Sequence, residues 1–180
     1  MTFRIRLALA AAVATLSFSV TPAIAAPSNQ GVTRGVTRAA IHVNPAGPDA
    51  ARVQAVLAEA DALESAGRIG EARKKYRALI DEQRQSDQYP SLALWRLANS
   101  YFYHDDEART AQVLDELAES AAHFGDPTME LRASFEAAVI YQHARASDKV
   151  ATKIARVQTL LKSPAIADEM KKEIQGRLVS

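Results

Sequence analysis

The chain has 180 residues, of which 48% are hydrophobic and 6% aromatic, and 22 basic against 21 acidic residues give a net charge of +1. This composition fits one soluble globular domain. Cysteine is absent, which excludes a disulfide scaffold, a thiol nucleophile, cysteine-ligated zinc, an iron–sulfur cluster and a lipid-modified cysteine. Alanine accounts for 36 residues, and its high helix propensity favours an all-α fold.

Residues 1–25 have the pattern of a cleaved signal peptide. Arg4 and Arg6 precede an apolar run, and Ala23 and Ala25 supply small side chains at positions −3 and −1 of a cleavage site. The apolar run is about 14 residues long, which is short for an uncleaved anchor, since a membrane-spanning helix needs about 20. We therefore expect cleavage after Ala25 and export of a soluble mature chain to the periplasm or the extracellular space, not as a lipoprotein.

Residues 26–48 predict a flexible arm. They contain three prolines, three glycines and a doubled Gly-Val-Thr-Arg at 31–34 and 35–38, and their apolar side chains follow no regular period. We expect this arm to act as a spacer. Alternatively, Arg34 and Arg38 contact an acidic partner or phospholipid headgroups.

From residue 49 onward, apolar side chains recur at spacings of three and four, which predicts helices. No stretch alternates between apolar and polar residues as a half-buried strand does. Turn-forming or polar segments separate the expected helices at Gly67, residues 81–87, residues 104–107, residues 125–127 and residues 163–164, and Ser147 is the expected N-cap of the sixth helix. The sequence therefore predicts seven helices over residues 49–180 and no sheet.

The expected helices form pairs, and the pairs repeat at offsets of 38 and 40 residues. The positions that align are Ala60, Ala98 and Ala138 in the first helices, and Tyr76, Leu114 and Ile154 in the second helices. A fixed period of this length indicates a solenoid, in which each helical hairpin buries its apolar face against its neighbours. We expect the three pairs at about residues 49–86, 89–124 and 127–162, followed by a capping helix at 164–178.

The first pair resembles a tetratricopeptide repeat. The small, large, glycine, acidic-alanine and aromatic positions of that repeat are matched by Ala60, Leu63, Gly67, Ile69, Glu71, Ala72 and Tyr76. The other two pairs match less of the pattern, since Thr110 and Val150 replace its second alanine. The resemblance covers about residues 50–162 and implies a right-handed stack of three antiparallel helical hairpins with a capping helix. A plain helical bundle is the alternative.

The resemblance also implies a binding site, because proteins of this family hold a segment of another protein in a groove lined by their first helices. On this chain the groove positions are Leu57, Asp61, Glu64, Trp95, Asn99, Phe102, Arg132, Phe135 and Gln142. Aromatic and arginine side chains are common anchors of protein interfaces. Trp95 and Phe135 fit a place in the core equally well. A shift of one residue would replace the second-pair set by Arg96, Ser100 and Tyr103.

Charge is unevenly distributed along the chain. Residues 105–136 carry nine acidic and two basic side chains, whereas residues 145–180 carry eight basic and four acidic ones. The basic segment includes a stripe on the sixth expected helix, formed by Arg145, Lys149, Lys153 and Arg156. We expect this stripe to be a solvated face; contact with the acidic fourth helix, with an acidic partner or with anionic lipid is the alternative. After signal cleavage 20 basic and 21 acidic residues remain, so we expect no nucleic-acid partner.

Catalytic and metal-binding patterns are weak. The segment at 104–107 offers histidine and acidic side chains, but four consecutive residues in a turn cannot all converge on one ion. Asp115 and Glu119 lie one helical turn apart and fit a solvated acidic face better than an acid–base pair. The sequence contains neither a Gly-x-Ser-x-Gly turn nor a glycine-rich phosphate loop. We therefore expect no catalysis, no cofactor and no metal.

These observations predict a non-catalytic adaptor or scaffold of the cell envelope that binds another protein or peptide. Self-association is a further expectation, because three repeats are close to the minimum for a stable array. The alternative function is a carrier of a small molecule or lipid, with a pocket formed by Trp95, Phe102, Phe135 and Tyr141.

Overall fold

The computed structural model describes residues 48–179; the expected signal peptide, with Ala23 and Ala25, and all of the expected arm but Pro48 lie outside them. Within the described range the chain forms helices and no strand, so the predicted all-α class is confirmed. The helices are α1 (Pro48–Ser65), α2 (Ile69–Gln85), α3 (Ser91–Phe102), α4 (Glu107–Phe124), α5 (Pro127–His143), α6 (Ser147–Leu160) and α7 (Asp168–Val179).

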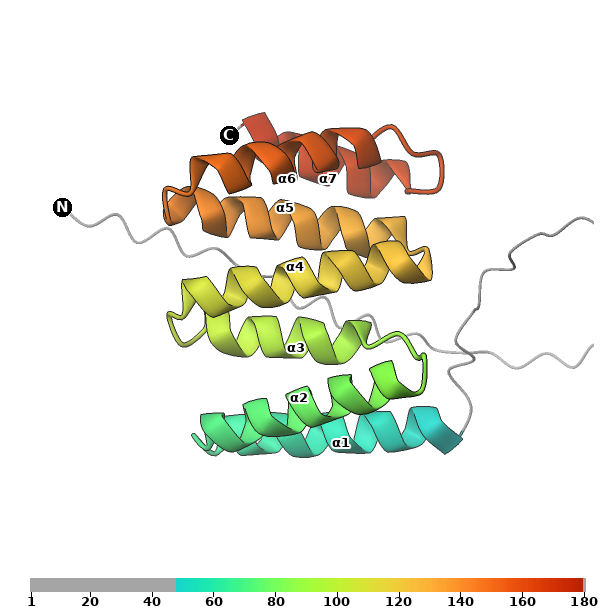
Figure 1. Ribbon diagram of the computed structural model, residues 1–180, viewed down its shortest axis with the longest axis vertical. Helices are drawn as coiled ribbons and strands as arrows, with labels where there is room; N and C mark the ends of the chain where they lie inside the picture. The colour runs from blue at the N-terminus through green and yellow to red at the C-terminus, as the bar shows by residue number, and fades with distance from the viewer. Residues whose placement is uncertain (1–47, 180) are drawn as a thin grey trace, which may run out of the picture. The chain divides into compact units, whose positions relative to one another are not determined.

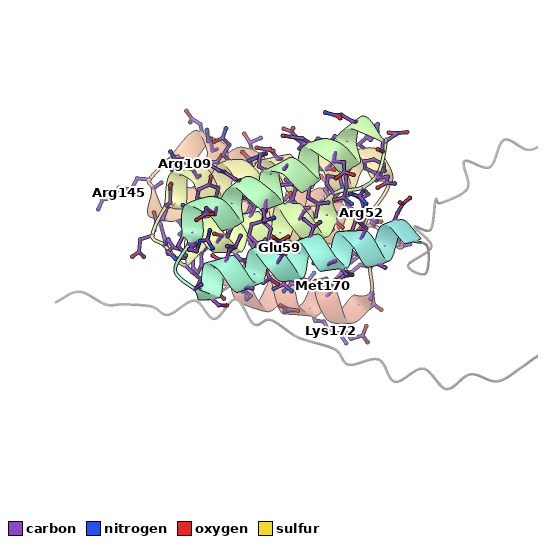
Figure 2. The ribbon with its side chains drawn as sticks, turned by 90° about the horizontal axis from the view of Figure 1, so that it is seen from below. Arg52, Glu59, Arg109, Arg145, Met170 and Lys172 are labelled. Atoms are coloured by element: carbon purple, nitrogen blue, oxygen red, sulfur yellow. The ribbon has the colours of Figure 1, made fainter. Side chains whose placement is uncertain are left out.

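The helices of residues 48–179 stack in chain order. From α1 to α6 each helix packs against the next one in the sequence, and α7 packs against α5 (Figure 1). Figure 2 looks along the stack. In this view α1 and α7 lie on the same side, and α2 lies on the other side. Arg52 and Glu59 mark α1, and Met170 and Lys172 mark α7.

Side-chain contacts between alternate helices define two layers. Asp61 and Arg96 link α1 to α3, and Trp95 and Arg132 link α3 to α5. Glu136 and Arg177 link α5 to α7. Two further pairs link α2 to α4 and α4 to α6, and these are Arg77–Glu116 and Asp115–Lys153. We refer to α1, α3, α5 and α7 as the first-helix layer, and to α2, α4 and α6 as the second-helix layer.

The core lies between the two layers and has two parts. The larger part extends from α1 to α5 and includes Tyr76, Leu97 and Leu117. The smaller part joins α5, α6 and α7 through Leu131, Phe135, Val157, Leu160, Ile166 and Ile174. The positions that align between the pairs in the sequence are all buried except Ile154, which is half-buried. Hydrophobic burial of this repeated pattern holds each helix on its neighbours.

Local sequence explains four of the helix ends. Gly67 and Gly125 follow α1 and α4 with φ of 76° and 72°, a left-handed conformation that glycine adopts without steric cost. Asp106 and Asp126 cap α4 and α5, because each carboxylate accepts a hydrogen bond from a backbone N–H of the first turn.

The last helix begins later than its predicted start at residue 164. Residues 161–167 form a turn after α6, and α7 begins at Asp168. Pro164 lies in the middle of that turn, and Ile166 is buried against α5 and α6 although it is not helical. The apolar residue that suggested a helical face is therefore an anchor of the turn.

Candidate functional site

One side of α3 faces outward from the first-helix layer. Its side chains recur at spacings of three and four residues, and we define the α3 face as Leu92, Trp95, Asn99, Phe102 and Tyr103. Leu92 is 39% exposed and Tyr103 is 61% exposed, whereas the other three are half-buried. The opposite side of α3 lies in the core. A surface with this many partly exposed aromatic rings is typical of a protein interface.

Acidic side chains of α1 border the α3 face. The hydroxyl of the buried Tyr76 donates a hydrogen bond to Asp61 at 2.5 Å, and the Glu64 carboxylate lies 3.3 Å from the same oxygen. Burial raises the pKa of Tyr76 above its ordinary value, and the two neighbouring carboxylates raise it further. Arg96 of α3 lies 3.5 Å from Asp61, and His104 lies 3.8 Å from Glu64. These two acidic residues therefore serve contacts within the fold.

Arg132 borders the α3 face on the side of α5. Its guanidinium carbon lies 4.7 Å from the centre of the Trp95 ring, the geometry of a cation–π contact. Asn99 lies one turn beyond Trp95 on the same side of α3. Gln142 is exposed at the far end of α5, three turns from Arg132.

Two predicted groove residues belong to the core instead. Leu57 is 3% exposed and Phe135 is 2% exposed. Phe135 lies under α7, where Arg177 covers its ring at 4.4 Å and Ile174 packs beside it. The core alternative for Phe135 is therefore the one observed, and neither Leu57 nor Phe135 is accessible to a partner.

The structure does not select one of the two possible registers on α3, because residues of both sets reach the surface. Ser100 belongs to the shifted set but is buried, and its hydroxyl and carbonyl oxygens accept hydrogen bonds from Arg73. The outward side includes the half-buried Trp95 and Asn99 together with the exposed Arg96 of the shifted set. Leu92 and Tyr103 share that side; Leu92 was not predicted, although its place three residues before Trp95 would have signalled it.

The basic stripe is largely occupied by contacts within the chain. Lys153 lies 2.7 Å from Asp115, and Arg156 lies 2.6 Å from Glu130. The stripe therefore reaches the acidic fourth helix at Lys153, which was one of the alternatives.

The other two members of the stripe differ from this pair. Lys149 covers the ring of Tyr141 with its ammonium group at 4.7 Å. Arg145 lies in the turn between α5 and α6 with φ of 56°, and not on α6 as expected.

The aromatic residues expected for a carrier pocket do not come together. Trp95 and Phe102 lie on the α3 face, Phe135 lies under α7, and the hydroxyl of Tyr141 donates to Asp115 of α4 at 2.6 Å. An open hollow of about 230 Å³ lies elsewhere, between the end of α2 and α4. It is lined by Arg84, Asp87, Glu116, Glu119, Ser120, His123 and Phe124.

The described residues hold no group of three or more histidine or acidic side chains arranged to bind a metal ion. None of the helices in residues 48–179 combines the length and hydropathy needed to cross a membrane. Comparisons of the chain with protein-family models, with curated proteins and with solved structures found no match.

Proposed function

We propose that this protein is an exported, non-catalytic adaptor that binds a segment of another protein on the first-helix layer of a tetratricopeptide-like stack. The observation that carries the proposal is the α3 face, where Leu92 and Tyr103 are exposed and Trp95 and Phe102 partly so. Large aromatic side chains with a polar residue among them contribute most of the binding energy in many protein interfaces.

The arrangement of the helices supports the repeat interpretation. Each pair contributes one helix to each layer, and the aligned alanines, Ala60, Ala98 and Ala138, are buried at equivalent places. α7 lies beside α5 in the first-helix layer, where the first helix of a further pair would lie. The signal-peptide pattern of residues 1–25 supports export to the periplasm or the extracellular space.

The test is affinity capture from a cell-envelope extract with the purified protein and two variants. A double variant, Leu92→Gln with Tyr103→Gln, makes the α3 face polar while keeping good helix formers. The control is Leu178→Gln, because Leu178 is 38% exposed on α7, nearly the same as Leu92. Thermal unfolding monitored by circular dichroism would verify that all three proteins are folded.

We expect a defined protein to be enriched by the parent and by Leu178→Gln, and its recovery to fall about tenfold or more with the double variant. Equal recovery with all three proteins would contradict binding through the α3 face. If no protein is enriched above a column without the adaptor, the adaptor function itself is contradicted.

A further inference from the structure

We propose that Arg132, held on Trp95, is the docking point for an acidic side chain of the partner segment. The inference rests on the proposed function and adds the chemistry of the partner: a protein segment in which Asp or Glu is flanked by apolar residues.

The argument starts from the hydrogen-bonding groups of Arg132. Three arginines in residues 48–179 are half-buried, namely Arg73, Arg77 and Arg132. Arg73 donates to Ser100, and Arg77 donates to Glu116. Arg132 makes no hydrogen bond or ion pair with an oxygen of the described residues, and its guanidinium lies over the Trp95 ring. A guanidinium has five N–H donors around its edge, and partial burial makes unsatisfied donors costly.

The position of the ring determines which part of Arg132 is available. The cation–π contact with Trp95 restricts the guanidinium and leaves the N–H donors on its edge without an acceptor from the described residues. That edge matches the two oxygens of a carboxylate, which can accept two parallel hydrogen bonds. The contact with Trp95 therefore restricts Arg132 before the partner arrives, which reduces the entropy lost on binding.

Neighbouring acidic residues do not cancel the charge of Arg132. Glu130 and Glu136 lie within one turn of it on α5, but Glu130 is paired with Arg156 and Glu136 with Arg177. The positive charge of Arg132 therefore stays available for an acidic group from another molecule.

The α3 face indicates what should flank the acidic residue. Leu92 lies one turn before Trp95, and Phe102 and Tyr103 lie two turns after it. The helix has 12 residues, which at 1.5 Å per residue makes it about 18 Å long. A partner segment of five or six extended residues, at about 3.3 Å each, spans this length. Apolar side chains on both sides of the acidic residue would then cover Leu92 in one direction and Tyr103 in the other.

The test is selection of random 12-residue peptides displayed on phage, with the purified protein as the target. We expect enriched peptides to carry Asp or Glu next to apolar residues. The best peptide would then be synthesised, together with a copy in which Gln or Asn replaces the acidic residue. Trp95 is the single tryptophan of the chain, so its fluorescence reports binding at this place.

Arg132→Gln should weaken binding of the acidic peptide about tenfold or more, as expected for hydrogen bonds to a charged group. Arg132→Lys should weaken it less, because the charge remains while the two-point geometry is lost. The matched control is Arg145→Gln, which removes an exposed arginine in the turn after α5 and should change the Kd by less than about twofold. The peptide with the neutral replacement should bind the parent and Arg132→Gln equally well.

The outcomes separate this inference from the proposed function. Selected peptides that lack acidic residues, or that bind Arg132→Gln as tightly as the parent, would overturn the role of Arg132 and leave the adaptor function standing. Loss of binding with Leu92→Gln and Tyr103→Gln, but not with Arg132→Gln, would do the same. If no peptide is enriched on the parent, the role of Arg132 and the peptide-binding function are both overturned.

Discussion

The pair Glu136–Arg177 fastens α7 to the stack, and the substitution Arg177→Met tests how strongly. The Glu136 side chain is 7% exposed. Arg177 donates two hydrogen bonds to it, at 2.6 and 3.1 Å. Removing one partner of a fully buried ion pair costs about 3–5 kcal/mol. Because the Arg177 side chain is itself 36% exposed, water can reach the carboxylate after the substitution, and we expect a loss of about 2–3 kcal/mol.

The assay is urea unfolding combined with native-state hydrogen exchange. Arg177→Met should lower the free energy of unfolding, and the amides of α7 should lose protection before those of α4. The double variant Glu136→Gln, Arg177→Met should recover part of the loss, because a neutral amide is less costly to bury than an unpaired carboxylate. A loss below about 0.5 kcal/mol for Arg177→Met, or no recovery in the double variant, would show that the ion pair does not hold α7.

Two other predictions follow from local structure. Burial, with a nearby carboxylate in each case, raises the pKa of Tyr76, Tyr89 and Tyr141. Above about pH 10 these tyrosines ionise in the unfolded chain but not in the folded one, so the free energy of unfolding should fall by up to about 1.4 kcal/mol per pH unit for each. Urea unfolding between pH 9 and 11 measures this; a slope that Tyr→Phe variants leave unchanged would contradict it. Gly125→Ala should lower the free energy of unfolding by about 1 kcal/mol, because alanine is strained at the positive φ of Gly125. Gly70 lies in the first turn of α2, and a Cβ added there meets open space. Gly70→Ala should therefore raise the free energy of unfolding, by up to about 1 kcal/mol. Equal thermal shifts for both glycine variants would refute the conformational argument.

Spacing along the sequence was enough to predict the helices. Apolar residues three and four apart, with breaks at Gly67 and Gly125, indicated elements that the structure contains with small shifts at their ends. The start of α7 was wrong because Ile166 follows the helical spacing but is fixed by packing in a turn. Such a contact depends on α5 and α6 and leaves no signal within the segment itself.

The candidate site was less predictable for the same physical reason. The family resemblance gave Phe135 an outward position on α5, but packing with α6, the turn at 161–167 and α7 makes it a core residue. The contact of Arg132 with Trp95 joins residues on different helix pairs, and pairing of Lys153 with Asp115 likewise needs the tertiary fold. The resemblance to a tetratricopeptide repeat implied one groove for Trp95, Asn99, Phe102 and Arg132, whereas burial and ion pairing decide which of their groups are available.

The two buried glutamates of α5 have a consequence for the order in which the chain can be completed during synthesis. Their cations come much later in the sequence, 26 residues after Glu130 and 41 after Glu136. A ribosome adding about 5–20 residues per second needs several seconds for the longer of these intervals. Throughout that time the carboxylates of Glu130 and Glu136 lack these partners and are costly to bury, while the helices before α5 can already pack together. The ion pairs of the final third of the stack therefore form last, and a chain that ends before Arg177 leaves Glu136 without this partner.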